Sequence, residues 1–125
     1  MSVLQIELEG GRTTWRPGEK LRGMASWLLA ESVESLEVRL IWFTRGKGTQ
    51  DVSVIDQRAF RLPALDGRDN FSFDLPAGPY SFSGRLISLT WALELVTPKG
   101  RESERVEFVL SPFESEIVLG SAEAS

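Results

Sequence analysis

Two residue types with versatile chemistry are missing from this chain of 125 residues, which has no cysteine and no histidine. Without cysteine there is no disulfide framework, thiolate nucleophile or zinc–thiolate site, so the fold must be held by packing. Without histidine, a Ser-His-Asp triad, a Cys-His pair and histidine metal sites are excluded. Most hydrolase chemistry is excluded with them. We therefore expect a protein that is not an enzyme and carries no metal or cofactor.

Long apolar runs are missing as well. No segment approaches the ~18 apolar residues of a membrane-spanning helix. Residues 1–9 alternate in polarity and lack the basic start and continuous apolar stretch of a secretory signal. Together with the lack of cysteine, these absences predict a cytoplasmic protein without integral membrane association.

An excess of positive charge is also missing. The chain has 14 Lys and Arg residues against 18 Asp and Glu residues, a net charge of -4, and the two signs are interspersed. Domains that bind a phosphate backbone are usually basic. Hydrophobic residues at 42% and charged residues at 26% are typical of a soluble globular domain. We expect a domain that does not bind nucleic acid.

Acidic side chains are the remaining candidates for chemistry. Residues 66–70 combine carboxylate and amide groups with an arginine, and they have fewer oxygen ligands than a calcium loop requires. Glu31 and Glu34 have the residue type of a glycosidase pair, but acids on a polar segment are usually just solvated. We interpret the first group as a polar loop and the second as polar surface.

Most of the chain alternates apolar and polar residues with a period of two, which is typical of β-strands. The predicted strands are residues 3–9, 20–29, 36–44, 51–60, 70–75, 83–96 and 102–110, with a short edge strand at 117–119. Glycine or proline places turns at 45–48 and 97–100. The strand at 83–96 is the longest and most apolar, so we expect it to be central.

Seven or eight short strands with turns between them predict an all-β protein, an antiparallel two-sheet β-sandwich of immunoglobulin-like architecture. Residues 30–35 are also compatible with a helix, although the β-rich residues 38–43 argue against extending it. We expect one domain over residues 1–119 and a disordered C-terminal tail over residues 120–125.

Two segments about sixty residues apart each join a Pro/Gly turn to a strand. The first contains Trp15, Pro17, Gly18, Glu19 and Gly23. The second contains Leu75, Pro76, Pro79, Ser81, Phe82, Gly84 and Trp91, with Tyr80 as an extra residue after Pro79. In their order and spacing these residues resemble the amino-terminal domain of the arrestin-like family, in particular its bacterial sporulation-control and retromer-arrestin members.

The resemblance implies an arrestin-like topology and the general role of an adaptor or scaffold that binds other proteins. Typical arrestins carry a second sandwich, so the clasp between two domains is not expected within this chain. From the residues alone, Pro17 and Gly18 shape the turn, and Gly23 and Gly84 allow a bulge or a close approach between the sheets. Ser81 is interpreted as a turn serine, since no nucleophile motif surrounds it.

Ile41 and Phe43 form an apolar surplus. They share an alternation phase with Glu37 and Arg39, which should face water when the opposite phase faces the core. Either the strand bulges or another segment covers the two residues, or they belong to a surface that binds a partner. The residues of the predicted interaction surface are Met24, Leu28, Ile41 and Phe43, with Trp15 as a further candidate.

These observations together predict a non-enzymatic protein-interaction module. The partner would bind a sheet face or add a strand to a sheet edge, and homo-oligomerisation by edge pairing is an allied possibility. The alternative is a β-sandwich that binds a carbohydrate or another small ligand, because an exposed tryptophan can stack on a sugar ring. An exposed Trp15 would favour that alternative, and a buried Trp15 would count against it.

Overall fold

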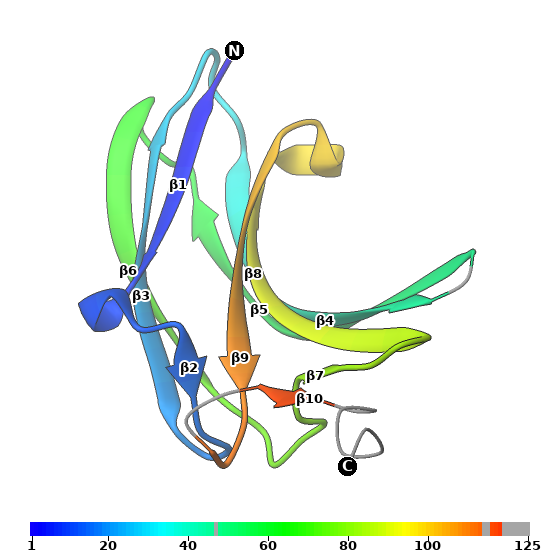
Figure 1. Ribbon diagram of the computed structural model, residues 1–125. Helices are drawn as coiled ribbons and strands as arrows, with labels where there is room; N and C mark the ends of the chain where they lie inside the picture. The colour runs from blue at the N-terminus through cyan, green and yellow to red at the C-terminus, as the bar shows by residue number, and fades with distance from the viewer. Residues whose placement is uncertain (47, 114–115, 119–125) are drawn as a thin grey trace, which may run out of the picture.

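The chain folds into β-strands joined by turns and loops, as seen in a computed structural model that describes residues 1–46, 48–113 and 116–118 (Figure 1). The strands are β1 (Val3–Leu8), β2 (Thr14–Trp15), β3 (Lys20–Leu28), β4 (Ser35–Gly46), β5 (Thr49–Arg61), β6 (Asp66–Asp74), β7 (Phe82–Ser83), β8 (Ile87–Val96), β9 (Ser103–Leu110) and β10 (Ile117–Val118). Two short 3₁₀ turns, η1 (Glu9–Gly11) and η2 (Pro98–Gly100), lie between strands. The predicted all-β class is confirmed.

The strands form two sheets. The small sheet has the order β1-β3-β6, and both of its pairings are antiparallel. The large sheet has the order β10-β7-β8-β4-β5, and β9 joins it through β8, as β2 does through β9. The two sheets pack face to face, and the ends of β4, β5 and β8 reach past the small sheet (Figure 1). This is the predicted two-sheet sandwich.

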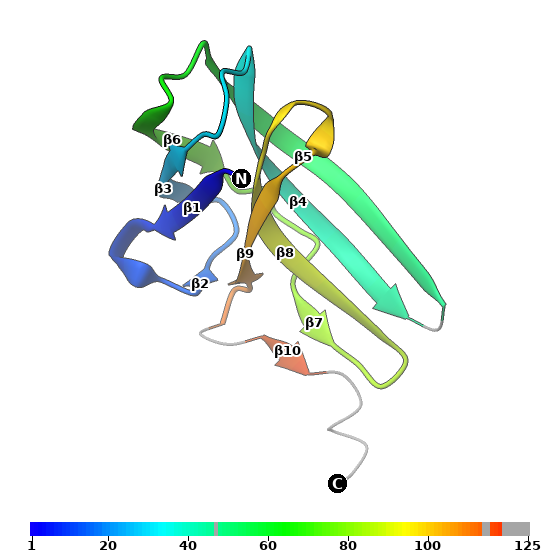
Figure 2. The ribbon, with the colours of Figure 1, turned by 90° about the horizontal axis from the view of Figure 1, so that it is seen from above.

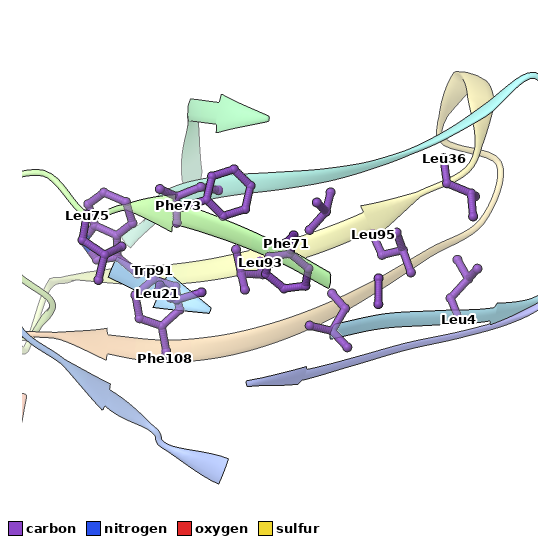
Figure 3. Packing of buried hydrophobic residues seen from close by; sticks show 14 of the residues in the cluster. Leu4, Leu21, Leu36, Phe71, Phe73, Leu75, Trp91, Leu93, Leu95 and Phe108 are labelled. Carbon is purple, nitrogen blue, oxygen red and sulfur yellow. The ribbon is translucent and has the colours of Figure 1, made fainter. Parts of the chain in front are cut away.

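The core lies between the sheets, because alternation turns every second side chain of a strand inward. Leu21 on β3, Phe73 on β6 and Trp91 on β8 are fully buried there (Figure 3). On β4 the predicted inward phase is confirmed, with Leu36, Val38 and Leu40 all buried. The strand predicted to be central is indeed so, because β8 pairs with β4 on one side and with β7 and β9 on the other.

Gly23 provides a close approach, as the sequence suggested. A Cβ atom added at Gly23 would lie 2.6 Å from Cζ of Phe71 and 2.7 Å from the carbonyl oxygen of Glu7. Phe71 stands directly opposite Gly23 on β6, so its ring fills the space that a side chain would need. The approach is between neighbouring strands of the small sheet, and not between the two sheets.

Most predicted strands agree with the observed ones to within two residues, and three segments differ by more. The strand expected over residues 83–96 is divided, because β7 ends at Ser83 and β8 begins at Ile87. Residues 66–70, expected as a polar loop, are the first half of β6 and pair with β3. Residues 30–34 form the connection from β3 to β4, so the helix alternative is wrong.

One strand was not predicted at all. The two residues of β2 run parallel to β9, with Trp15 opposite Leu110. Two residues beside a Pro-Gly turn are too few to show a period in the sequence. Of the other predictions, Lys47 in the first turn, Leu119 of the last strand and the tail at 120–125 lie outside the described residues.

Candidate interaction surface

Three of the five residues predicted to form an interaction surface are buried. Trp15 and Ile41 are each 1% exposed and Phe43 is 0% exposed, so these three cannot belong to an exposed interaction surface and, for Ile41 and Phe43, the covered alternative holds. Leu28 is 54% exposed and Met24 is half-buried. These last two lie on the outer face of the small sheet, whereas Ile41 and Phe43 lie on the large sheet. The five residues therefore do not form one surface.

Met24 and Leu28 each line a hollow at the small sheet, and the hollow beside Met24 also includes Arg58, Ala59 and Phe60 of β5. The hollow beside Met24 has a volume of about 860 Å³ and includes Glu7, Arg22 and Asn70 among its lining residues. The hollow beside Leu28 has a volume of about 590 Å³. Charged and amide groups surround the apolar side chain in the first hollow, so this face is mixed in polarity rather than an apolar patch.

Ile41 and Phe43 are covered although they face away from the core. With Ala92 on β8 they form a second, small apolar cluster on the outer face of the large sheet. The guanidinium carbon of Arg45 lies 4.9 Å from the centre of the Phe43 ring, and that of Arg105 lies 4.7 Å from it. Long arginine side chains can cover apolar surface while their charged ends stay in water. The cover is therefore made by arginine side chains, and not by residues 30–35.

Arg105 is held over the ring by an ion pair. Its Nη2 atom lies 2.9 Å from Oε2 of Glu94, on the adjacent strand β8. The bulge suggested for the strand that carries Ile41 and Phe43 is not in β4, which pairs with β8 without a shift in register. The shift in its pairing with β5, between Leu40 and Ile41, leaves Ile55 of β5 as the extra residue. The arginine cover explains how the outward-facing phase of β4 can be apolar without binding a partner.

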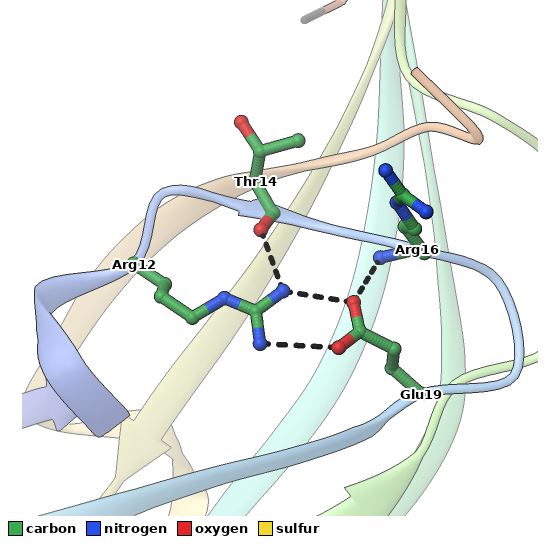
Figure 4. A network of polar contacts seen from close by, with 4 residues as sticks. All are labelled: Arg12, Thr14, Arg16 and Glu19. Atoms are coloured by element: carbon green, nitrogen blue, oxygen red, sulfur yellow. Dashed lines mark hydrogen bonds and ion pairs between the residues drawn. The ribbon is translucent and has the colours of Figure 1, made fainter. Parts of the chain in front are cut away.

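Trp15 is buried beneath another arginine, in the turn that the sequence singled out. Figure 4 shows the polar contacts of this turn, which join Arg12, Thr14, Arg16 and Glu19. The guanidinium of Arg12 lies 3.8 Å from the centre of the Trp15 ring and donates hydrogen bonds to both carboxylate oxygens of Glu19. It also donates to the carbonyl oxygen of Thr14, and the backbone N–H of Arg16 donates to Glu19. The hydrogen bonds from Arg12 and then Arg16 hold the pKa of Glu19 below its ordinary value. Glu19 thus closes the turn as a structural clasp.

The two motif segments are joined to each other. The backbone N–H of Gly18 donates to the carbonyl oxygen of Leu75, and the N–H of Leu75 donates to that of Glu19, at 3.0 and 2.9 Å. Gly18 has a φ of 81°, a left-handed value that favours glycine. The two motif segments therefore meet at Gly18, Glu19 and Leu75, at one end of the sandwich, and these bonds stabilise the fold.

Ser81 has a similar structural role. It is fully buried, its N–H donates to the carbonyl oxygen of Leu110, and its Oγ accepts a hydrogen bond from the N–H of Leu110 at 2.9 Å. The indole N–H of Trp91 donates to the carbonyl oxygen of Pro79 at 2.7 Å. These bonds fix the segment before β7 against the end of β9. Ser81 is a bridge between two segments rather than the turn serine expected.

The surface that the sequence analysis missed is strand β5. Val52, Val54 and Ile55 are 53%, 52% and 42% exposed, and they follow one another along the strand. β5 is the end strand of the large sheet, where Figure 2 shows it along the outer side of the sheet, beyond β4. The signal in the sequence is the break of alternation at Val54-Ile55, which is where the pairing with β4 shifts.

Part of the free edge of β5 is capped by its own side chains. Oδ1 of Asp56 accepts a hydrogen bond from the backbone N–H of Gln57, and Nη1 of Arg58 donates to the carbonyl oxygen of Gln57, at 2.8 and 2.9 Å. Asp56 and Arg58 also pair with each other at 2.8 Å. The hydrogen bond from Arg58, followed in size by that from Gln57, lowers the pKa of Asp56.

The alternative function loses its main support, because that support was an exposed tryptophan that could stack on a sugar. Trp15, Trp27 and Trp91 are buried, and Trp42 is packed against the core. Within residues 1–46, 48–113 and 116–118, no group of three or more acidic side chains is placed to hold a metal ion. No helix in that part of the chain is long and apolar enough to cross a bilayer.

The two packed sheets, with the two motif segments hydrogen-bonded to each other at one end, define the class as a β-sandwich of arrestin-like fold. The chain is similar to Spo0M, a sporulation control protein from Bacillus subtilis, with a TM-score of 0.62 at 16% sequence identity. The match covers 88% of this chain but 49% of Spo0M, so the chain spans about half of that protein. The fold expected from the sequence resemblance is confirmed, and at this identity the likeness concerns the fold alone.

Two other solved structures are less alike. A β-glucosidase from Listeria innocua in complex with gluconolactone has a TM-score of 0.48 at 14% identity, over 93% of this chain and 16% of that one. A superoxide reductase (neelaredoxin) from Ignicoccus hospitalis has a TM-score of 0.43 at 12% identity, over 86% and 80%. With TM-scores below 0.5, neither likeness supports a functional inference. No protein-family model and no curated protein matches the chain.

Proposed function

We propose that this chain is a non-enzymatic protein-interaction module of the adaptor or scaffold kind, and that its partner binds along β5. The observation that carries the proposal is the exposed row of Val52, Val54 and Ile55 on the end strand of the large sheet. A cytoplasmic location is part of the proposal and is supported by the absence of cysteine.

Two physical properties make β5 suited to binding. The outer backbone groups of an end strand can accept another strand, whose main-chain hydrogen bonds then contribute affinity. Exposed aliphatic side chains along such an edge give the partner apolar surface to bury, and apolar patches on a folded domain tend to be interaction sites. Val52 and Val54 have both properties. They precede the bulge in β5, whereas the Asp56–Arg58 pair that caps part of the edge follows it.

Affinity capture from the host lysate, compared by mass spectrometry, tests the proposal. The wild-type chain should enrich a partner that a Val52→Lys/Val54→Lys variant fails to enrich, because two charges on an edge oppose strand addition. Substituting Ile41 and Phe43 would be a poor test, since both are buried and a charge there would unfold the chain.

The chain offers a matched control in Val3 and Leu28. These two aliphatic residues are directly opposite each other on β1 and β3 and are as exposed as Val52 and Val54. A Val3→Lys/Leu28→Lys variant should keep the partner. Loss of the partner in this control alone would move the surface to the small sheet, and enrichment by all three proteins would refute a role for β5.

A further inference from the structure

We infer that two copies of this chain pair through β5, antiparallel about a two-fold axis, with Val54 of each copy opposite Ile55 of the other. The inference rests on the proposed function, because it takes the β5 edge as the binding surface and names a second copy as its occupant. A two-fold contact of this kind uses the same strand twice, so it closes as a dimer and does not propagate into a fibre.

The position of β5 makes such pairing possible. Among the described strands, β5 pairs only with β4, so its other edge carries no neighbour (Figure 2). The outer ends of β4 and β5 also reach past the small sheet, which leaves room for a second chain beside them (Figure 1).

The bulge restricts the possible registers. Before the bulge, Ser53 lies opposite Trp42, which packs against the core; after the bulge, Asp56 lies opposite Leu40, which is part of the core. The inner face of β5 therefore carries residues 51 and 53 before the bulge and residues 56 and 58 after it. When two copies pair antiparallel along most of β5, the first half of one strand lies against the second half of the other. Because side chains alternate between the two faces, only every second register puts the inner faces of both strands on the same side.

Charge selects one of these registers. With Val54 opposite Ile55 of the second copy, Asp51 lies opposite Arg58 of the second copy, and the two-fold axis repeats this pair. Moving the strands by two residues places Asp51 opposite Asp56 in one direction and opposite Phe60 in the other. Opposite charges across a strand pair stabilise it and like charges destabilise it. The favoured register thus has two ion pairs around an aliphatic centre.

The cap on Gln57 fits the same register. Gln57 lies opposite Val52 of the second copy, whose backbone can take over the hydrogen bonds that Asp56 and Arg58 now make to Gln57. Arg58 then exchanges Asp56 for Asp51 of the second copy. In the single chain, Asp56 and Arg58 satisfy the backbone N–H and C=O groups of Gln57 and so oppose indiscriminate strand pairing. The dimer therefore forms only as the protein concentration rises.

Sedimentation velocity over a range of concentrations, from micromolar to submillimolar, tests the pairing by a charge exchange. The wild type should pass from monomer to dimer. Asp51→Arg and Arg58→Asp should each weaken the dimer by about tenfold or more, because each places like charges opposite one another. The double variant Asp51→Arg/Arg58→Asp should restore it, since the exchanged pair is again self-complementary. Asp66→Arg, an exposed acid on β6, is the control that should leave the dimer unchanged.

Restoration by the double variant separates a lost contact from a damaged fold. A wild type that stays monomeric throughout, or a dimer that both single variants leave unchanged, would overturn the inference. Because the chain has no cysteine, Val54→Cys and Ile55→Cys variants can also be mixed and oxidised, and a disulfide between the two is expected. A monomeric wild type whose β5 still captures a different protein would refute self-pairing and leave the proposed function standing.

Discussion

In each of two cross-strand pairs on the outer face of the large sheet, one side chain is buried and the other is exposed. Ile41 pairs with Val54 and Phe43 pairs with Val52 across the β4–β5 hairpin. The β4 members are buried, whereas their β5 neighbours are about half exposed. The difference lies in position: β4 has strands on both sides and arginine side chains above it, and β5 has neither. Burial on an outer face is thus decided by the neighbouring strands and by the side chains that cover the face.

The largest difference in stability is expected when Phe43 and its cross-strand neighbour Val52 are each truncated to alanine. Phe43→Ala should lower the free energy of unfolding by about 3 kcal/mol, at the lower end for a buried phenylalanine because its cluster is small. Val52→Ala, at the paired position, should change it by less than about 0.5 kcal/mol. Urea unfolding followed by tryptophan fluorescence measures both. Equal effects would show that the two positions do not differ in burial.

A smaller effect is expected from removing the cover itself. Arg45→Ala/Arg105→Ala removes two guanidinium groups from the Phe43 ring and the ion pair with Glu94. The expected loss is about 1.5 kcal/mol, from two partly exposed cation–π contacts and one ion pair. Arg68→Ala, at an exposed position on β6, is the control and should have little effect. If the two variants were equally stable in urea, the arginines would not be what buries Phe43.

A still smaller effect on stability is expected from Glu19, which pairs with Arg12, the arginine that covers the Trp15 ring. The folded chain keeps the pKa of Glu19 below its ordinary 4.5, mainly through the hydrogen bond from Arg12, so folding favours the ionised carboxylate. This contribution is present above the unfolded pKa and is lost as the pH falls through the lower, folded value. Because Arg12 and Glu19 are both partly exposed, Glu19→Gln should cost only about 0.5 kcal/mol at neutral pH.

Thermal unfolding of wild type and Glu19→Gln between pH 7 and pH 2.5 checks the sign. The gap between the two proteins should close on the acid side of 4.5. Asp56, whose pKa is also lowered, remains in both proteins, so its contribution cancels in the comparison. A gap that stayed constant with pH would show that Glu19 acts through packing and not through its charge.

Much of the fold could be predicted from the sequence because alternation is a local signal. The inward phase of β4 and the central place of β8 follow from which residues repeat every second position. The strand β2 could not be found, because two residues carry no period. The break of alternation at Val54-Ile55 marks the bulge in β5, but it does not give the exposure of the strand, since a place at the end of a sheet depends on pairings with distant parts of the chain. For the same reason the sequence left open whether Ile41 and Phe43 are covered or form a binding surface.

The smallest expected effect is on stability when charge is placed on β5. Val52→Lys/Val54→Lys should change the free energy of unfolding by less than about 0.5 kcal/mol, because both side chains are already half in water and a lysine stem can lie along the strand. Urea unfolding measures this value in the same samples that are used for partner capture. An unfolded or strongly destabilised variant would mean that β5 is covered like β4. A stable variant that loses its partner would mean that the two strands differ because one is packed and the other is free to bind.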